Sequence, residues 1–162
     1  MSEQQSVPTQ LFYPLDKDSA SVVERIILQT KWPQSRWPNV GRIIVLKVLD
    51  DATVLTTGDG KVIFNVPEEL DNTLLIAAHA FVTTVSSSGV ITVQIRNVTD
   101  SVDLLTTAIT IDASEFDSYT AATPPLINFT NAQLSKSDRI AIDVDGAGTG
   151  VKGLSVYLSI QS

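Results

Sequence analysis

Hydrophobic and polar positions alternate with a period of two along most of the chain from Arg42 onward. Short runs rich in Val, Ile and Thr are separated by clusters of Gly, Asp, Asn and Ser, which favour turns. The runs cover residues 42–49, 61–66, 73–85, 90–98, 104–112, 125–129, 139–145 and 151–160. They predict eight short strands, a number typical of a β-sandwich.

The alternation also indicates which side chains face the core. In residues 90–98, Ile91, Val93 and Ile95 alternate with polar side chains, and residues 139–145 repeat this spacing. One buried and one solvated face is typical of antiparallel sheets, whereas parallel sheets give continuous apolar runs. We therefore expect an all-β protein, an antiparallel β-sandwich of the jelly-roll type. The alternative is a Greek-key sandwich of other connectivity.

The first part of the chain has a different texture. Four of the seven prolines are Pro8, Pro14, Pro33 and Pro38, and proline interrupts regular structure. Residues 1–49 hold six basic and four acidic residues, whereas the rest holds five and fourteen. The segment 21–31 fits either a short capped helix or a strand. We predict an extended N-terminal arm at residues 1–41 and a β-sandwich domain at residues 42–162.

The composition narrows the classes of function. The chain has 162 residues, 43% of them hydrophobic, which suffices for one core. No apolar run approaches the roughly 20 residues of a membrane-spanning helix, and the N-terminus lacks a secretory pattern, so we expect no membrane partner. Zero Cys and one His leave few routes to catalysis or metal binding, and a net charge of −7 disfavours nucleic acid. We predict a protein that is not an enzyme and that has no cofactor, catalytic residue, bound metal or nucleic-acid partner.

The segment KWPQSRWPN, residues 31–39, contains both tryptophans of the chain. A cation, Trp, Pro and a side-chain amide occur twice at a spacing of five residues. Trp and Arg dominate the binding energy of many interfaces, and proline holds a segment extended. The pattern predicts a docking or interface site made by Lys31, Trp32, Arg36 and Trp37. The alternative is that both indoles fold back and cover the core of the sandwich.

Three other positions are candidates for specific chemistry. The sequence DVDG at residues 143–146 begins like a calcium loop but lacks the closing Glu, so we interpret it as two outward aspartates before a glycine turn. His79 lies between small apolar residues and is expected to be partly buried; the alternative is a pH switch at a subunit boundary. Tyr119, in a loop, is the best candidate for stacking on a sugar ring.

Three segments resemble a module found in many virion proteins of tailed bacteriophages. They read TVLTTGDGKVIFNVPEEL (residues 53–70), VQIRNVTDSVDLLTTAITIDASE (93–115) and DRIAIDVDGAGTGVKGLSVYLSI (138–160). The resemblance extends from residue 52 to residue 162. It implies a jelly-roll sandwich that occurs at the C-terminus of longer structural proteins or alone behind a short arm, in capsid decoration, head-fibre or tail-tip proteins.

The organisation of the chain indicates which role within a virion to expect. A tail fibre joins its tip to a long shaft or to coiled-coil heptads, and the sequence has none. We therefore expect a capsid decoration, or cement, protein on the capsid surface, with the major capsid protein as partner and a dimer or trimer as the functional form. The alternative is a receptor- or carbohydrate-binding tip of a phage fibre or spike, with Tyr119 at the sugar.

Overall fold

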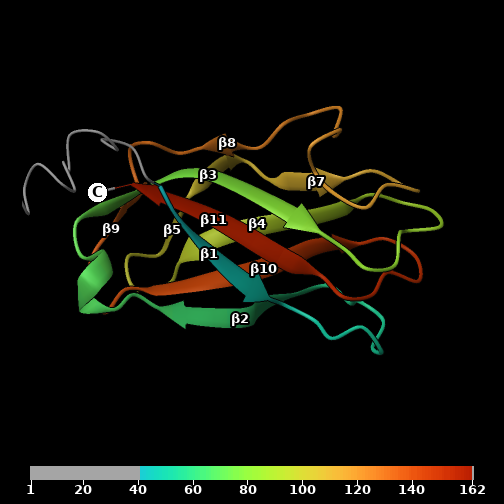
Figure 1. The fold of residues 1–162 in the computed structure, drawn as a ribbon, viewed down its shortest axis with the longest axis horizontal. Helices are drawn as coiled ribbons and strands as arrows, with labels where there is room; N and C mark the ends of the chain where they lie inside the picture. Colours follow the sequence, from blue (N-terminus) through green and yellow to red (C-terminus); the bar gives the residue numbers. More distant parts are fainter. Residues whose placement is uncertain (1–40, 162) are drawn as a thin grey trace, which may run out of the picture. The chain divides into compact units, whose positions relative to one another are not determined.

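The apolar runs of the sequence form antiparallel strands that pack as two facing sheets (Figure 1). The structure is a computed structural model, and it describes residues 41–161. Sheet 1 has the strand order β1 (Arg42–Lys47), β11 (Ser155–Gln161), β3 (Thr73–Phe81) and β9 (Gln133–Leu134). Sheet 2 has the order β2 (Gly58–Asn65), β10 (Arg139–Ala147), β4 (Ile91–Asn97) and β5 (Val102–Asp103), and β7 (Ile109–Ile111) also pairs with β4.

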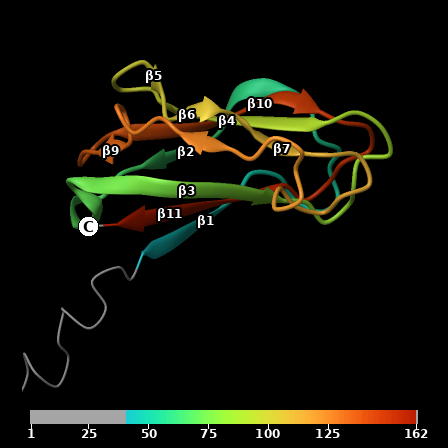
Figure 2. The ribbon, with the colours of Figure 1, turned by 90° about the horizontal axis from the view of Figure 1, so that it is seen from above.

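The order of the strands identifies the fold as a jelly roll. The chain passes between the sheets from β1 to β2, β3 and β4, and returns through β9, β10 and β11. The last two strands lie in the middle of the two sheets, β10 between β2 and β4 and β11 between β1 and β3. Figure 2 shows the two layers from the side. The predicted antiparallel β-sandwich of the jelly-roll type is thus confirmed.

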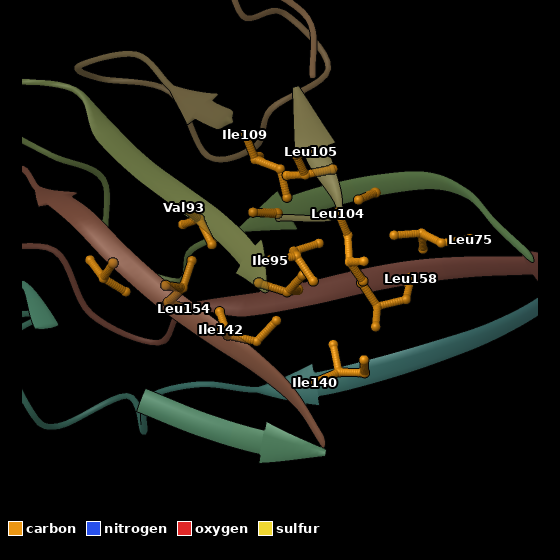
Figure 3. Packing of buried hydrophobic residues seen from close by; sticks show 14 of the residues in the cluster. Leu75, Val93, Ile95, Leu104, Leu105, Ile109, Ile140, Ile142, Leu154 and Leu158 are labelled. Carbon is orange, nitrogen blue, oxygen red and sulfur yellow. The ribbon is translucent and has the colours of Figure 1, made fainter. Parts of the chain in front are cut away.

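The core lies between the sheets and is built from the alternating positions. Ile91, Val93 and Ile95 of β4 point inward and are fully buried, as the pattern predicts. Sheet 1 contributes Leu75 and Leu158 from the opposite side, so the two sets pack face to face (Figure 3). Burying these branched aliphatic side chains is the main favourable term in the stability of the fold.

Two of the predicted strands have different bounds. Residues 104–112 form β6 (Leu105–Thr107), which pairs with β8 (Leu126–Ile127), and then the separate strand β7. Leu104 and Leu105 are both buried although they are neighbours, so the alternation breaks there. The Leu104 amide donates instead to the Ile95 carbonyl at 2.8 Å.

The other shifted strand is the last one. It begins at Ser155 and not at residue 151, because Gly153 has a left-handed backbone (φ +68°). A Cβ at this position would collide with the side chains of Thr83 and Asp51. The short strands β5 and β9, and the 3-10 turn at Glu68–Leu70, have too few residues to show a periodic pattern.

Candidate interaction surface on sheet 1

The outer side of β3 is apolar where a solvated strand would be polar. Its inward positions are buried as expected, but Leu74, Ile76, His79 and Phe81 point outward. A register shift between β11 and β3 places Ile76 and its neighbour Ala77 on the same side. Such a bulge leaves two side chains opposite one partner, which adds apolar area to this part of the sheet.

The neighbouring strands continue this apolar surface across the sheet. Their register brings Val45 of β1 opposite Tyr157 of β11, and Tyr157 opposite His79 of β3. Because paired residues in antiparallel strands share a face, these three side chains lie in one row on the outer side. Ile43, two residues before Val45, is on the same side and is 66% exposed.

The segment after β7 adds a further edge to this surface. The Val82 amide donates to the Phe116 carbonyl at 2.8 Å, and the Ser118 amide donates to the Ala80 carbonyl at 3.0 Å. The buried hydroxyl of Ser118 accepts a hydrogen bond from the Ala80 amide at 3.0 Å. These bonds hold residues 116–118 alongside β3 and determine where the next residue, Tyr119, lies.

Tyr119 covers His79 and is itself exposed. The two ring centroids are 4.3 Å apart at an angle of 31°, and Tyr119 is 70% exposed. The Tyr119 amide donates to a carboxylate oxygen of Asp117 at 2.9 Å, which fixes the turn. Burial lowers the pKa of His79 below its usual value, and the nearby negative charge of Asp117 opposes that shift. The Nδ1 atom of His79 is buried and has no hydrogen-bond partner among residues 41–161.

Two hollows flank this pair of rings. One, of about 380 Å³, is lined by Ile43, Phe81, Asp117, Tyr119 and Tyr157. The other, of about 230 Å³, lies between β3 and residues 124–129 and has both His79 and Phe129 in its wall. The stacked rings of His79 and Tyr119 therefore join the two hollows into one continuous surface.

We call this surface the apolar face. It consists of Ile43, Val45, Leu74, Ile76, His79, Phe81, Tyr119, Leu126, Phe129 and Tyr157. An exposed apolar patch of this extent is typical of a surface that contacts another molecule. Among the side chains that line the two hollows within residues 41–161, a single one is charged, that of Asp117.

The aspartates at residues 143 and 145 differ in exposure: Asp145 is exposed, whereas Asp143 is buried. Asp143 pairs with Gln94 and lies on the outer side of sheet 2, as the interpretation expects, but it is buried there. It accepts a hydrogen bond from the Gly60 amide at 2.5 Å and lies 3.5 Å from Nε of Arg96. The first residues of β2 cover it, which sequence periodicity alone does not reveal. Within residues 41–161, no three His, Asp or Glu side chains are grouped closely enough to hold a metal ion.

The structure shows where some of the candidate residues lie. Tyr119 lies on the apolar face, and His79 is partly buried, as expected. The proposed docking residues Lys31, Trp32, Arg36 and Trp37 lie outside the described residues, as does the segment 21–31. The apolar face itself was not predicted. A signal existed, because residues 42–49 and 73–81 have apolar side chains at successive positions where a half-solvated strand would alternate.

The comparisons with known proteins add no relative. No family model matches the chain, and neither a curated protein nor a solved structure is significantly similar to it. Residues 41–161 contain no helix with the length and apolar character required to cross a membrane. The fold and the surface together define a jelly-roll β-sandwich with one apolar outer face.

Proposed function

We propose that this chain is a structural protein of a tailed-bacteriophage virion that decorates the capsid. Its activity is binding: it attaches to the assembled head lattice and stabilises it mechanically. The observation that carries the proposal is the apolar face, because a sandwich that exposes Ile43, Tyr119 and Phe129 on one side is suited to contact with other protein surfaces. The resemblance of residues 52–162 to phage virion modules supplies the setting.

The proposed mechanism is thermodynamic linkage. A protein that binds the assembled shell, and not the dissociated subunits, adds its binding free energy to the stability of the shell. In this proposal the arm docks on the major capsid protein through Lys31, Trp32, Arg36 and Trp37. The sandwich forms a homo-oligomer, so that several arms bind one lattice with increased avidity. The proposal includes neither a nucleic-acid nor a membrane partner.

Co-sedimentation with capsids that lack the protein tests this role. We expect the full chain to bind at a fixed stoichiometry and to raise the temperature at which the capsids disassemble. The double variant Trp32→Ala, Trp37→Ala should bind at least about 30-fold more weakly, since interface hot spots are worth 2 kcal/mol or more. Gln34→Ala, in the same segment, is the matched control and should bind normally. Absence of binding by the full chain would exclude the decoration role.

A second candidate function is carbohydrate binding by a fibre or spike tip. It is favoured by the hollow of about 380 Å³, whose lining includes Tyr119, Tyr157 and Asp117. Aromatic rings stack on the apolar face of a sugar, and a carboxylate accepts hydrogen bonds from its hydroxyl groups. Glycan-array binding that is lost in Tyr119→Ala and retained in Phe116→Ala would favour this function over decoration.

A further inference from the structure

We propose that the apolar face is the surface through which two copies of this chain associate about a two-fold axis. This inference rests on the proposed function in one respect, since it names the surface of the homo-oligomer in that proposal. The association itself involves only the chain, so it is tested without capsids. The area, the shape and the charge of the face each favour this association.

The exposed area matches what a stable dimer requires. An aromatic side chain offers about 150–250 Å² for burial, and Tyr119 and Phe129 are 70% and 68% exposed. Ile43, Val45 and Leu126 are each more than half exposed. The whole face therefore offers on the order of 800 Å², the area that each partner contributes to a typical stable interface. The largest apolar patch of an ordinary monomer is only about 300–600 Å².

The shape of the face suits contact with a copy of itself. A two-fold interface uses the same patch on both subunits, so that patch must carry both protruding groups and hollows that receive them. The apolar face has both, because Leu126 and Phe129 are largely exposed in the segment beside β3, and a hollow of about 380 Å³ lies on the other side of Tyr119. In the proposed dimer, the exposed side chains of each copy enter this hollow in the other.

The low charge of the apolar face makes it better suited to self-association than the other surfaces of the sandwich. The chain has a net charge of −7, and like charges that meet across a two-fold axis repel one another. The apolar face has Asp117 as the charged side chain in its hollows, among the described residues. The outer side of sheet 2 instead carries the exposed carboxylates of Asp59 and Asp145, whose like charges would meet if two such surfaces were placed together. Sheet 1 is thus the side on which two acidic copies can meet.

Sedimentation velocity of the full chain over a range of concentrations tests the dimer. We expect a dimer for the natural sequence, and at least about 30-fold weaker association for Val45→Asp and for Phe129→Asp. Ile63→Asp is the matched control: Ile63 is 47% exposed on β2 of sheet 2, so this variant should remain a dimer. Circular dichroism spectra should be the same for all three variants, because each position is exposed.

A second measurement locates the axis. The chain has no cysteine, so a single Ser159→Cys substitution on the outer side of β11 gives one labelling site. Spin labels at this position should show strong coupling between copies, whereas labels at Lys61→Cys on β2 should show weak coupling. Close labels at residue 61 and distant labels at residue 159 would overturn the proposal.

The remaining outcomes are also decisive. A monomer at all concentrations, a trimer, or a dimer that persists in both face variants would each overturn the two-fold association on this face. Co-sedimentation of the monomeric Val45→Asp variant with capsids separates the two proposals. If it still binds capsids, although weakly, decoration stands independently of the dimer. If the natural dimer forms but does not bind capsids, the dimer stands and decoration fails.

Discussion

The two sheets of the sandwich have equivalent inner sides and contrasting outer sides. On sheet 2 the outward residues of β4 are Thr92, Gln94 and Arg96, which gives the polar surface expected of a solvated sheet. On sheet 1 the corresponding positions of β1 are Ile43, Val45 and, at the end of the strand, Lys47. The same alternation thus builds one core and two unlike surfaces, which indicates that the inner positions of a strand carry the fold while the outer positions are free to differ between the sheets.

The largest expected effects test the equivalence of the inner sides. Ile142→Ala in sheet 2 and Leu158→Ala in sheet 1 each remove buried methyl groups from the same core. Each should lower the free energy of unfolding by about 2–5 kcal/mol, because a cavity remains where the side chain was. Urea denaturation followed by circular dichroism measures this loss. A loss below 1 kcal/mol in one sheet only would show that the two sheets do not share one cooperative core.

Substitutions on the outer sides of the two sheets should have smaller and unequal effects on stability. Asp143→Ala removes the acceptor of the Gly60 amide and the partner of Arg96 in a buried place. It should cost about 1–3 kcal/mol, the penalty for leaving a buried polar group without a partner. Ser159→Ala, on the outer side of sheet 1, should change stability by no more than about 0.5 kcal/mol. Asp143→Asn retains an acceptor for Gly60 and should lie between the two.

His79 gives a pH dependence that is specific to sheet 1. Burial lowers its pKa, so the folded protein binds this proton less readily than the unfolded chain does. The contribution of His79 to the free energy of unfolding is therefore most favourable above its unfolded pKa near 6.5, and it falls as the pH drops below that value. Thermal unfolding between pH 7.5 and pH 5 should show this loss, and His79→Gln should reduce it.

Nuclear magnetic resonance can measure the same group directly. His79 is the chain's single histidine, so one imidazole signal titrates. Its pKa should be below 6.5 and should fall further in Asp117→Asn, because the charge of Asp117 raises it. A pKa at or above 6.5 would contradict the burial of the ring beneath Tyr119.

The smallest expected change in stability comes from Asp145, on the outer side of sheet 2. The pKa of Asp145 is raised, first by partial burial and then by the negative charges of Asp143, Asp59 and Asp103. The charged form is therefore disfavoured in the folded protein, and stability declines as the pH rises through the folded pKa. Asp145→Asn should slightly raise the melting temperature at pH 7 and leave it unchanged at pH 3. An equal rise at both pH values would mean that charge is not the cause.

The hydrophobic pattern predicts the strands and the core positions, but it does not determine the strand order or the extent of the apolar face. The period of two in residues 90–98 correctly identifies Ile91, Val93 and Ile95 as core, because alternation reports burial on one side. Strand order is not periodic, so the central position of β11 is visible only in the structure. The apolar face combines residues that are far apart in sequence: the register brings Val45 opposite Tyr157, and the hydrogen bonds of residues 116–118 to β3 place Tyr119 beside Tyr157. The burial of Asp143 likewise depends on the start of β2, more than 80 residues away.

The central position of the last two strands has a consequence for how the protein is made. β10 joins β2 to β4, and β11 joins β1 to β3, so neither sheet can close before residues 139–161 leave the ribosome. Until then the earlier strands have open edges and unburied apolar side chains, the state in which β-proteins aggregate. Folding is expected to be slow and dominated by long-range contacts. Nascent chains of this protein should therefore depend on a chaperone, or on a low rate of synthesis, for soluble expression.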